Sequence, residues 1–230
     1  ELLETMLFTP EGGVFLLLGH LHRMCCSAVA LGFHCPSERQ ISEVLERASL
    51  NWPAAPQRVR LLLSPGGECR VEHTPLAPIM QQPRPHMPIL KEIAKNGANG
   101  LRVRLDPEWT PSGHAQLRHK TTSRQVYDDA RVRAGVGANG IEDVLMHNEA
   151  GEITECSIAN IALEEPSGLW ITPHRDCGLL PGVMRAELIR LDQILERTIL
   201  LNELQLAMHA GRRLVAFNSV RGVFAVTLVI

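Results

Sequence analysis

The chain lacks the features that mark a nucleic-acid-binding protein or a membrane protein. Its 230 residues carry a net charge of −2, with neither a basic excess nor an acidic tail. Its apolar runs, such as "GGVFLLLGHL" at residues 12–21, are far shorter than the roughly 20 residues of a membrane span. Internal repeats and low-complexity segments are also absent from the sequence. We therefore expect neither nucleic acid nor a membrane as a partner.

The six cysteines include no CxxC pair. Scattered cysteines of this kind favour reduced thiols, so we expect a cytoplasmic protein. The segment "HLHRMCC" resembles a metal-binding run, but His20 and His22 are two residues apart and would point away from each other on a helix. We expect no metal site. The sequence begins at Glu1 without a Met or a secretory lead, so we expect a fragment or a trimmed chain.

One glycine-rich motif is misleading. "GVGANG" at residues 135–140 matches the G-x-G-x-x-G pattern of dinucleotide-binding sites. That motif needs a strand before it and a helix after it, so that the pyrophosphate lies on the helix N-terminus. Here the order is reversed, and the glycines are more simply a helix stop and a turn.

The pattern of elements predicts an α+β protein with two domains. We expect an N-terminal domain at residues 1–106, a linker at 107–117 and a C-terminal domain at 118–230, with the cofactor or substrate in a cleft between them. In the first half we predict strands at 2–8, 12–18, 58–64, 68–73 and 100–106 and helices at 21–31 and 37–50. In the second half we predict helices at 122–135 and within 177–195, and strands at 141–147, 152–163, 168–173, 196–204 and 212–229.

Three features of the second half fit one kind of chemistry. Lys120 lies among small hydroxyl residues at the junction of the halves, and a lysine held in a cleft is a good amine nucleophile. Glu155 lies on an otherwise neutral strand, where a buried carboxylate needs a positive partner. Pro181 and Gly182 precede a helix whose first N–H groups would bind an anion. A nucleophilic amine, a carboxylate and an anion-binding site are together what pyridoxal phosphate (PLP) requires.

Each feature also has an ordinary structural explanation. Lys120 alone is more often a solvated surface residue, and Glu155 alone is more often paired with a nearby arginine. A Pro-Gly pair before a helix is often only a start signal. On these physical grounds alone, a PLP site and an unrelated arrangement remain equally open.

The order of the motifs resembles a known family. "HKTTSR…Y", "GEITECSIANI" and "LLPGVMR", together with "LLETMLF…EGGVFLLLGHLHRMCCSAVALGF" at the start, are similar to the class IV aminotransferase family, the fold-type IV PLP enzymes. The resemblance covers essentially the whole chain. Its nearest branch is 4-amino-4-deoxychorismate lyase, where Thr-Glu-Cys precedes a small residue and Ala-Asn. The fold it implies is a small α+β N-terminal domain and a larger C-terminal domain with a pseudo-barrel.

The resemblance assigns roles to particular residues. It implies that Lys120 forms the aldimine with PLP and later moves protons, and that Glu155 holds the pyridinium nitrogen. It implies phosphate binding by Arg23 with the backbone N–H groups of Val183 and Met184. Two further implied residues rest on looser alignments: Arg60 would bind a substrate carboxylate and Thr5 would line the catalytic site.

Three functions remain open at this stage. The resemblance favours a lyase of folate synthesis that converts aminodeoxychorismate, through an external aldimine, to 4-aminobenzoate and pyruvate. A transaminase of the same fold, acting on D-amino acids, branched-chain amino acids or amines, is the alternative. A non-catalytic pseudoenzyme is the second alternative. We also expect a small-molecule amine substrate and a homodimer, both by resemblance.

The chain departs from the aminotransferase pattern at several positions. Leu7 stands where many relatives carry a substrate-facing Arg. Gln125 stands where the branched-chain enzymes have a Tyr on the cofactor ring, and Tyr127 is nearby but out of register. "FNSVRG" replaces a Gly-Thr pair. These departures count against an ordinary branched-chain transaminase without establishing a lyase.

Overall fold

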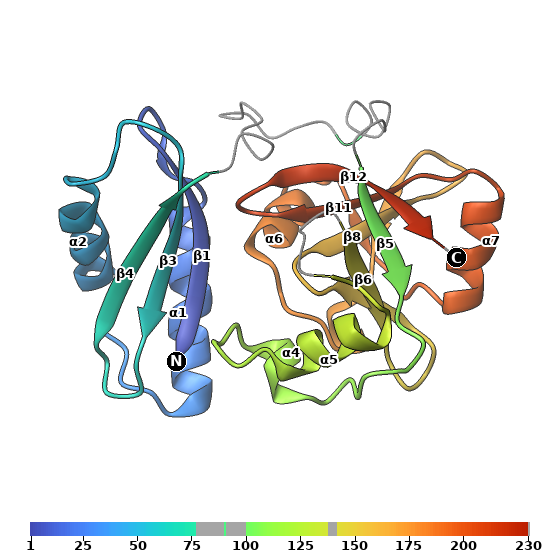
Figure 1. Ribbon diagram of the computed structural model, residues 1–230, viewed down its shortest axis with the longest axis horizontal. Coiled ribbons are helices and arrows are strands. Elements are labelled where there is room, and N and C mark those ends of the chain that lie inside the picture. The colour runs from blue at the N-terminus through green and yellow to red at the C-terminus, as the bar shows by residue number, and fades with distance from the viewer. Residues whose placement is uncertain (77–89, 91–99, 138–141, 230) are drawn as a thin grey trace. The chain divides into compact units, whose positions relative to one another are not determined.

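The computed structural model describes residues 1–76, 90, 100–137 and 142–229, which form two compact units (Figure 1). Both units combine helices with a β-sheet, so the predicted α+β class is confirmed. The first unit contains the described part of Glu1–Pro85, with His119–Ser123 and Ser219–Arg221. The second unit contains the described part of His86–Arg118, Arg124–Asn218 and Gly222–Ile230.

The first unit is an antiparallel sheet with two helices packed on one face. Its strands lie in the order β2–β1–β3–β4. Met24 of α1 and Ile41 of α2 belong to one buried cluster with Met6 of β1 and Leu61 of β3, which forms the core of the unit. The elements are β1 (Leu2–Thr9), β2 (Gly13–Val14), α1 (Leu17–Leu31), α2 (Glu38–Ser49), β3 (Gln57–Leu63) and β4 (Cys69–Pro75).

Local signals in the sequence of the first unit are confirmed. Ser37 caps α2 through a reciprocal capping box with Gln40, an arrangement that satisfies two otherwise unpaired N–H groups. Gly32 ends α1 at φ 69°, a left-handed conformation that favours glycine. The predicted hairpin of β3 and β4 is also present.

The predicted second strand of this unit is wrong in length. The sequence predicts a strand at residues 12–18, but only Gly13 and Val14 pair with β1, and α1 begins at Leu17. Leu16 takes a φ of 55°, which turns the chain out of the strand and into the helix. The apolar run therefore serves a strand at one end and a helix at the other.

The second unit is built on a mixed eight-stranded sheet in the order β10–β9–β8–β11–β12–β5–β6–β7. Strand β5 lies between β12 and β6 and runs parallel to both. The strands are β5 (Leu101–Leu105), β6 (Glu142–His147), β7 (Ile153–Cys156), β8 (Asn160–Glu164), β9 (Trp170–Thr172), β10 (Leu195–Glu196), β11 (Leu214–Asn218) and β12 (Gly222–Val229). The helices are α4 (Ala115–Arg118), α5 (Gln125–Arg133), α6 (Val183–Arg190) and α7 (Leu201–His209), with a 3-10 turn at Arg175–Cys177.

Helices cover both faces of this sheet, as the alternating side chains of β6 show. Leu145 belongs to the buried cluster that includes Leu204 of α7. Its neighbours Val144 and Met146 belong to a second cluster, with Leu117 of α4 and residues of α5. Because successive side chains of a strand point to opposite faces, α7 and the α4–α5 pair lie on opposite sides of β6.

Four predictions in this unit need correction. The strand at 100–106 exists as β5, but it pairs with the second unit's sheet rather than closing the first half, because alternation predicts a strand and not its partners. Residues 201–204 are helical, since Leu201, Leu204 and Met208 continue at helical spacing. The predicted strands at 152–163 and 212–229 are each two strands, β7 with β8 and β11 with β12.

Some sequence predictions concern residues that the structure covers only in part. The proline-broken segment "APIMQQPRPHMP" at residues 77–88, which the sequence predicts to be a surface excursion, lies outside the described residues. So do residues 138–140 of the "GVGANG" segment, whose first glycine, Gly135, has a φ of 64° and follows α5 as predicted. In the part of the chain that is described, every helix is too short or too polar to cross a membrane.

Candidate active site

Glu155 lies on β7 with only 3% of its surface exposed. A buried carboxylate is costly unless hydrogen-bond donors reach it. The Tyr127 hydroxyl donates to Oε1 at 2.9 Å and the Leu180 backbone N–H donates to the same oxygen at 2.8 Å. The Asn160 side-chain amide donates to Oε2 at 3.1 Å. Donors from α5, from β8 and from the loop before α6 therefore fix both carboxylate oxygens.

The loop before α6 packs closely on this carboxylate site. A Cβ atom at Gly182 would lie 2.0 Å from Oδ1 of Asn160, well inside van der Waals contact. The Asn160 amide also donates to the backbone oxygen of Leu180 at 3.0 Å. Gly182 is thus required by close approach, and Glu155, Asn160 and the loop form one hydrogen-bonded cluster.

Helix α6 begins beside this cluster. Its first intrahelical bond joins the Ala186 N–H to the oxygen of Gly182 at 2.9 Å. The N–H groups of Val183 and Met184 precede that bond, and amides in this position of a helix attract an anion. Phosphate binding by these two amides stays a prediction, but the helix start adjoins the loop that contacts Glu155.

Tyr127 belongs to the site, although the tyrosine of the branched-chain relatives corresponds in position to Gln125. Its side chain is buried, its hydroxyl bonds Glu155, and the Arg124 guanidinium carbon lies 4.9 Å from its ring centroid. Gln125, at the register of the relatives' tyrosine, is exposed and bonds Asp129 at 2.6 Å. Two residues correspond to about 200° around a helix, which puts Gln125 and Tyr127 on different sides of α5. The available signal was that Tyr127 is the single tyrosine of the chain.

Lys120 lies in the first unit, in the segment His119–Ser123. The Leu3 N–H donates to the Lys120 backbone oxygen at 2.9 Å, and Thr121 forms a β-bridge with Leu2. The backbone at Lys120 and Thr121 is therefore attached to β1, although the sequence places this lysine with the second half.

A buried carboxylate cluster lies on the helix-covered side of β1. Arg23 donates from Nε and Nη2 to the two oxygens of Glu4, at 2.8 and 2.5 Å. Nδ1 of the fully buried His20 lies 2.7 Å from Oε2 of Glu4. Neither Glu4 nor His20 is predicted as a site residue from the sequence, although an acidic residue between Leu2 and Met6 on an inward-facing stretch of strand is a usable signal.

The charges in this cluster follow from burial and pairing. Burial by itself would raise the pKa of Glu4, but the charge of Arg23 and the hydrogen bonds of His20 and Arg23 outweigh it and lower the pKa to about 2. Burial lowers the pKa of His20; Glu4 opposes this, and the charges of Arg23 and Lys120 add to it. Glu4 is thus ionised, His20 is neutral, and Arg23 is held at two points. Its predicted phosphate contact stays a prediction.

Thr5 and Arg60 are brought together on the other face of the first sheet. They are directly opposite each other in the β1–β3 ladder, and Leu7 is opposite Arg58 two positions along. Arg60 forms an ion pair with Glu72 at 2.8 Å. These side chains share one face because residues two apart on a strand point the same way. Thr5, predicted to line the catalytic site, and Arg60, predicted to bind a substrate carboxylate, are therefore neighbours, and both roles stay predictions.

Comparison with known proteins identifies the family. The model of the family described as "Amino-transferase class IV" matches residues 1–229. A curated relative from Schizosaccharomyces pombe, named "Putative aminodeoxychorismate lyase", is 32% identical over 232 residues, covering 100% of this chain and 90% of the relative. The chain belongs to the class IV aminotransferase family, whose members are PLP-dependent lyases and aminotransferases.

Solved structures agree with this assignment. A "Putative amino-acid aminotransferase" from Mesorhizobium loti is 31% identical, with a TM-score of 0.78 and 99% of both chains covered. A "Putative 4-amino-4-deoxychorismate lyase" from Legionella pneumophila has a TM-score of 0.75 at 19% identity, covering 99% of this chain and 82% of that one. The second likeness bears on the fold alone. The predicted fold type IV architecture is confirmed.

Proposed function

We propose that this protein is a PLP-dependent 4-amino-4-deoxychorismate lyase that releases 4-aminobenzoate and pyruvate. The observation that carries the proposal is the buried Glu155, whose two oxygens are fixed by three donors beside the start of α6. The name of the Schizosaccharomyces pombe relative supports this particular reaction.

The donor set of the chain fits PLP. A buried carboxylate suits the protonated ring nitrogen, since burial strengthens the attraction between opposite charges. The amides of Val183 and Met184 at the start of α6 suit the phosphate, and the resemblance to the family adds Arg23 as a further phosphate-binding group. The absence of a side chain at Gly182 lets the loop approach Asn160 closely. When bound, PLP withdraws electrons from the amine-bearing carbon of the substrate and makes its proton acidic.

The chain's own residues would then hold and move protons. Lys120 would hold the cofactor and would serve as the base that takes the proton from the amine-bearing carbon of the substrate. The bond between the ring carbon and the ether oxygen of the enolpyruvyl group breaks, and the ring becomes aromatic. Lys120 returns a proton to the departing enol, which becomes pyruvate. Glu155 would hold the ring nitrogen of the cofactor, while Tyr127 and Asn160 keep the carboxylate oxygens in place.

The first sheet offers groups for an anionic substrate. Arg58 and Arg60 lie on the same face as Thr5, and aminodeoxychorismate carries two carboxylates. Because Arg60 is paired with Glu72, a substrate carboxylate would share the guanidinium with Glu72 or displace it. We propose that Thr5 and Arg60 contact the substrate.

A transaminase is the second candidate, and the Mesorhizobium loti structure is the observation that favours it. Both reactions use Lys120 to remove the same proton, so these residues alone do not separate them. Pyruvate release from aminodeoxychorismate without any keto-acid acceptor is expected for the lyase. A rate that depends on a keto-acid acceptor would instead establish the transaminase.

The cofactor assignment is tested by absorbance. Purified protein with added PLP should show the near-visible band of lysine-bound cofactor, and Lys120→Ala should abolish the band. Lys95→Ala, which changes another lysine, should keep it. If neither the wild type nor the Lys120 variant shows a band, the enzyme proposal fails and a non-catalytic scaffold becomes the better explanation.

We also propose a homodimer in the cytoplasm. Class IV enzymes tend to build their sites near a dimer interface, and the six cysteines are unpaired thiols, as expected in a reducing compartment. Light scattering of the purified chain measures the assembly directly.

A further inference from the structure

Hydrogen bonds hold the turn between β7 and β8 at every backbone polar group. Its three residues, Ser157, Ile158 and Ala159 (the β7–β8 turn), have all six of their backbone N–H and C=O groups hydrogen-bonded. The bonds are Ser157 N to Val144 O, Ile158 N to Asp143 Oδ2, Ala159 N to Cys156 O, Arg124 Nη2 to Ser157 O, Asn218 Nδ2 to Ile158 O, and Cys156 N to Ala159 O. A three-residue connection with every polar group bonded has little freedom to move.

This turn sets the relative position of two site residues. Glu155 lies on β7 just before it, and Asn160 is the first residue of β8 just after it. In the sheet, β7 pairs with β6, whereas β8 pairs with β9 and β11. The two strands are thus not ladder partners, and the sheet alone does not align Glu155 with the Asn160 amide that bonds it.

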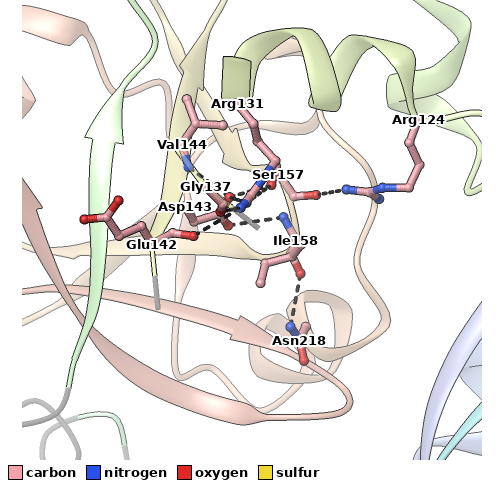
Figure 2. Close-up of polar contacts among 9 residues, drawn as sticks. All are labelled: Arg124, Arg131, Gly137, Glu142, Asp143, Val144, Ser157, Ile158 and Asn218. Atoms are coloured by element: carbon pink, nitrogen blue, oxygen red, sulfur yellow. Dashed lines mark hydrogen bonds and ion pairs between the residues drawn. The ribbon is translucent and has the colours of Figure 1, made fainter. Parts of the chain in front are cut away.

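Asp143 of β6 is the centre of the network around the turn (Figure 2). Its side chain is fully buried, and Arg131 of α5 donates to its Oδ1 at 2.9 Å. The Ser157 hydroxyl donates to the same oxygen, and the Ile158 N–H donates to Oδ2 at 3.3 Å. Arg131 also reaches Oγ of Ser157 at 3.1 Å. One carboxylate therefore ties the turn to α5 and to β6.

Helix α5 contributes twice to the same turn. Arg124, at its start, donates to the Ser157 oxygen at 2.7 Å, and Arg131 contacts the Ser157 hydroxyl. Residues seven apart lie on one side of a helix, and Tyr127, between them, bonds Glu155. The helix side that holds the turn is thus the side that holds the carboxylate.

We propose that Asp143 and Arg131 are positioning residues, which hold the β7–β8 turn so that Glu155 and Asn160 meet the cofactor ring in a fixed arrangement. The consequence for cofactor binding rests on the proposed function. That Asp143 and Arg131 hold the turn follows from their contacts with Ser157 and Ile158 alone. Neither residue touches the cofactor in this proposal; both act through Ser157 and Ile158.

Both carboxylate oxygens of Asp143 act as acceptors in this network. The pKa of Asp143 lies above its ordinary value because burial raises it, and the hydrogen bonds from Ser157, Val144 and Ile158 and the charge of Arg131 offset only part of this rise. An asparagine has one accepting oxygen, and its amide would face a donor. Asp143→Asn would therefore leave either Ile158 N–H or the Ser157–Arg131 pair without its acceptor.

The chain provides a matched control. Arg133, also on α5, forms a similar ion pair with the buried Asp106, with Nε to Oδ1 at 3.0 Å and Nη2 to Oδ2 at 2.6 Å. Both aspartates have fully buried side chains, and both arginines come from the same helix. Asp106→Asn breaks a buried pair that anchors α5 without a contact to the β7–β8 turn.

The test measures three quantities in the wild type, Asp143→Asn and Asp106→Asn. They are the urea midpoint, the amide hydrogen-exchange rate of a peptide spanning residues 156–160, and the dissociation constant of PLP. Both variants should lower the midpoint. Asp143→Asn should raise the exchange rate of the peptide roughly tenfold, and should also raise the dissociation constant of PLP roughly tenfold. A change of this size is the effect of losing one hydrogen bond to a charged group. Asp106→Asn should change both by less than about twofold.

The outcomes separate the two proposals. If both variants shift the exchange rate and the PLP affinity in proportion to their lost stability, Asp143 contributes only to stability and its positioning role is refuted. If Asp143→Asn does not fold, Ser157→Ala removes the hydroxyl link alone and should show the same two effects more weakly; no effect there refutes the role. If the wild type binds no PLP, the proposed function fails, and the exchange comparison still decides whether Asp143 holds the turn.

Discussion

The buried carboxylate of Glu4 makes a quantitative prediction about acid stability. Its pKa is about 2 in the folded protein, against an ordinary value of 4.5. A carboxyl group with a lowered pKa stabilises the folded state above its unfolded pKa, and this contribution is lost as the pH falls towards the folded pKa. The perturbation we consider is therefore acidification, compared between the wild type and Glu4→Gln.

The magnitude follows from the size of the shift. Each unit of pKa difference corresponds to about 1.4 kcal/mol, so the shift contributes about 3 kcal/mol at neutral pH. With these two pKa values, about 2 kcal/mol of that contribution disappears between about pH 5 and about pH 3. Glu4→Gln has no group to titrate at this position. Its free energy of unfolding should fall by about 2 kcal/mol less than that of the wild type over the same interval.

Urea unfolding followed by circular dichroism at several pH values measures this difference. The neighbouring His20 adds a cost of its own in acid, because burial lowers its pKa. That cost is common to both proteins while the imidazole stays neutral in the fold, so it cancels in the difference; the same comparison in a His20→Asn background checks this. Parallel profiles for the wild type and Glu4→Gln would refute the assignment of Glu4 as an ionised, paired carboxylate.

Two further predictions concern the site around Glu155. Tyr127→Phe removes one donor to Glu155, and we expect the PLP dissociation constant to rise roughly fivefold with little change in the fold, since one hydrogen bond is worth about 1 kcal/mol; an unchanged constant in an absorbance titration would rule out this role. Gly182→Ala places a Cβ against Asn160, so PLP binding should weaken at least tenfold. Gly113→Ala, where the added atom meets open space, should leave PLP affinity unchanged, and equal effects of the two alanines would contradict the close-approach argument.

The sequence predicts well whatever depends on neighbouring residues. Ser37 and Gln40 are three apart and cap α2 close to the start of the predicted helix at 37–50, because a capping box is a local interaction. The turn of β3 and β4 and the end of α1 at Gly32 are local in the same sense. The burial of Glu155 also follows from its apolar neighbours on the strand.

What the sequence does not predict depends on distant partners. The pattern of β5 identifies a strand but not that its partners are β12 and β6. Tyr127 is missed because the helix register that brings it to Glu155 is fixed by packing rather than by distance from Lys120. Asp143 carries no signal in the sequence, since its role appears only when β6, α5 and the β7–β8 turn are brought together.

The place of β12 in the second sheet has a consequence for how this unit folds. It lies between β11 and β5, and Val226 of β12 pairs with Leu101 of β5, at the other end of the unit's sequence. The sheet cannot be completed until this late strand arrives, so contacts of high sequence separation dominate and folding should be slow. Until then, β5 and β11 each present an unpaired edge, which invites pairing with another chain. Removing β12 would divide the sheet into two smaller sheets, one of four strands (β10, β9, β8 and β11) and one of three (β5, β6 and β7).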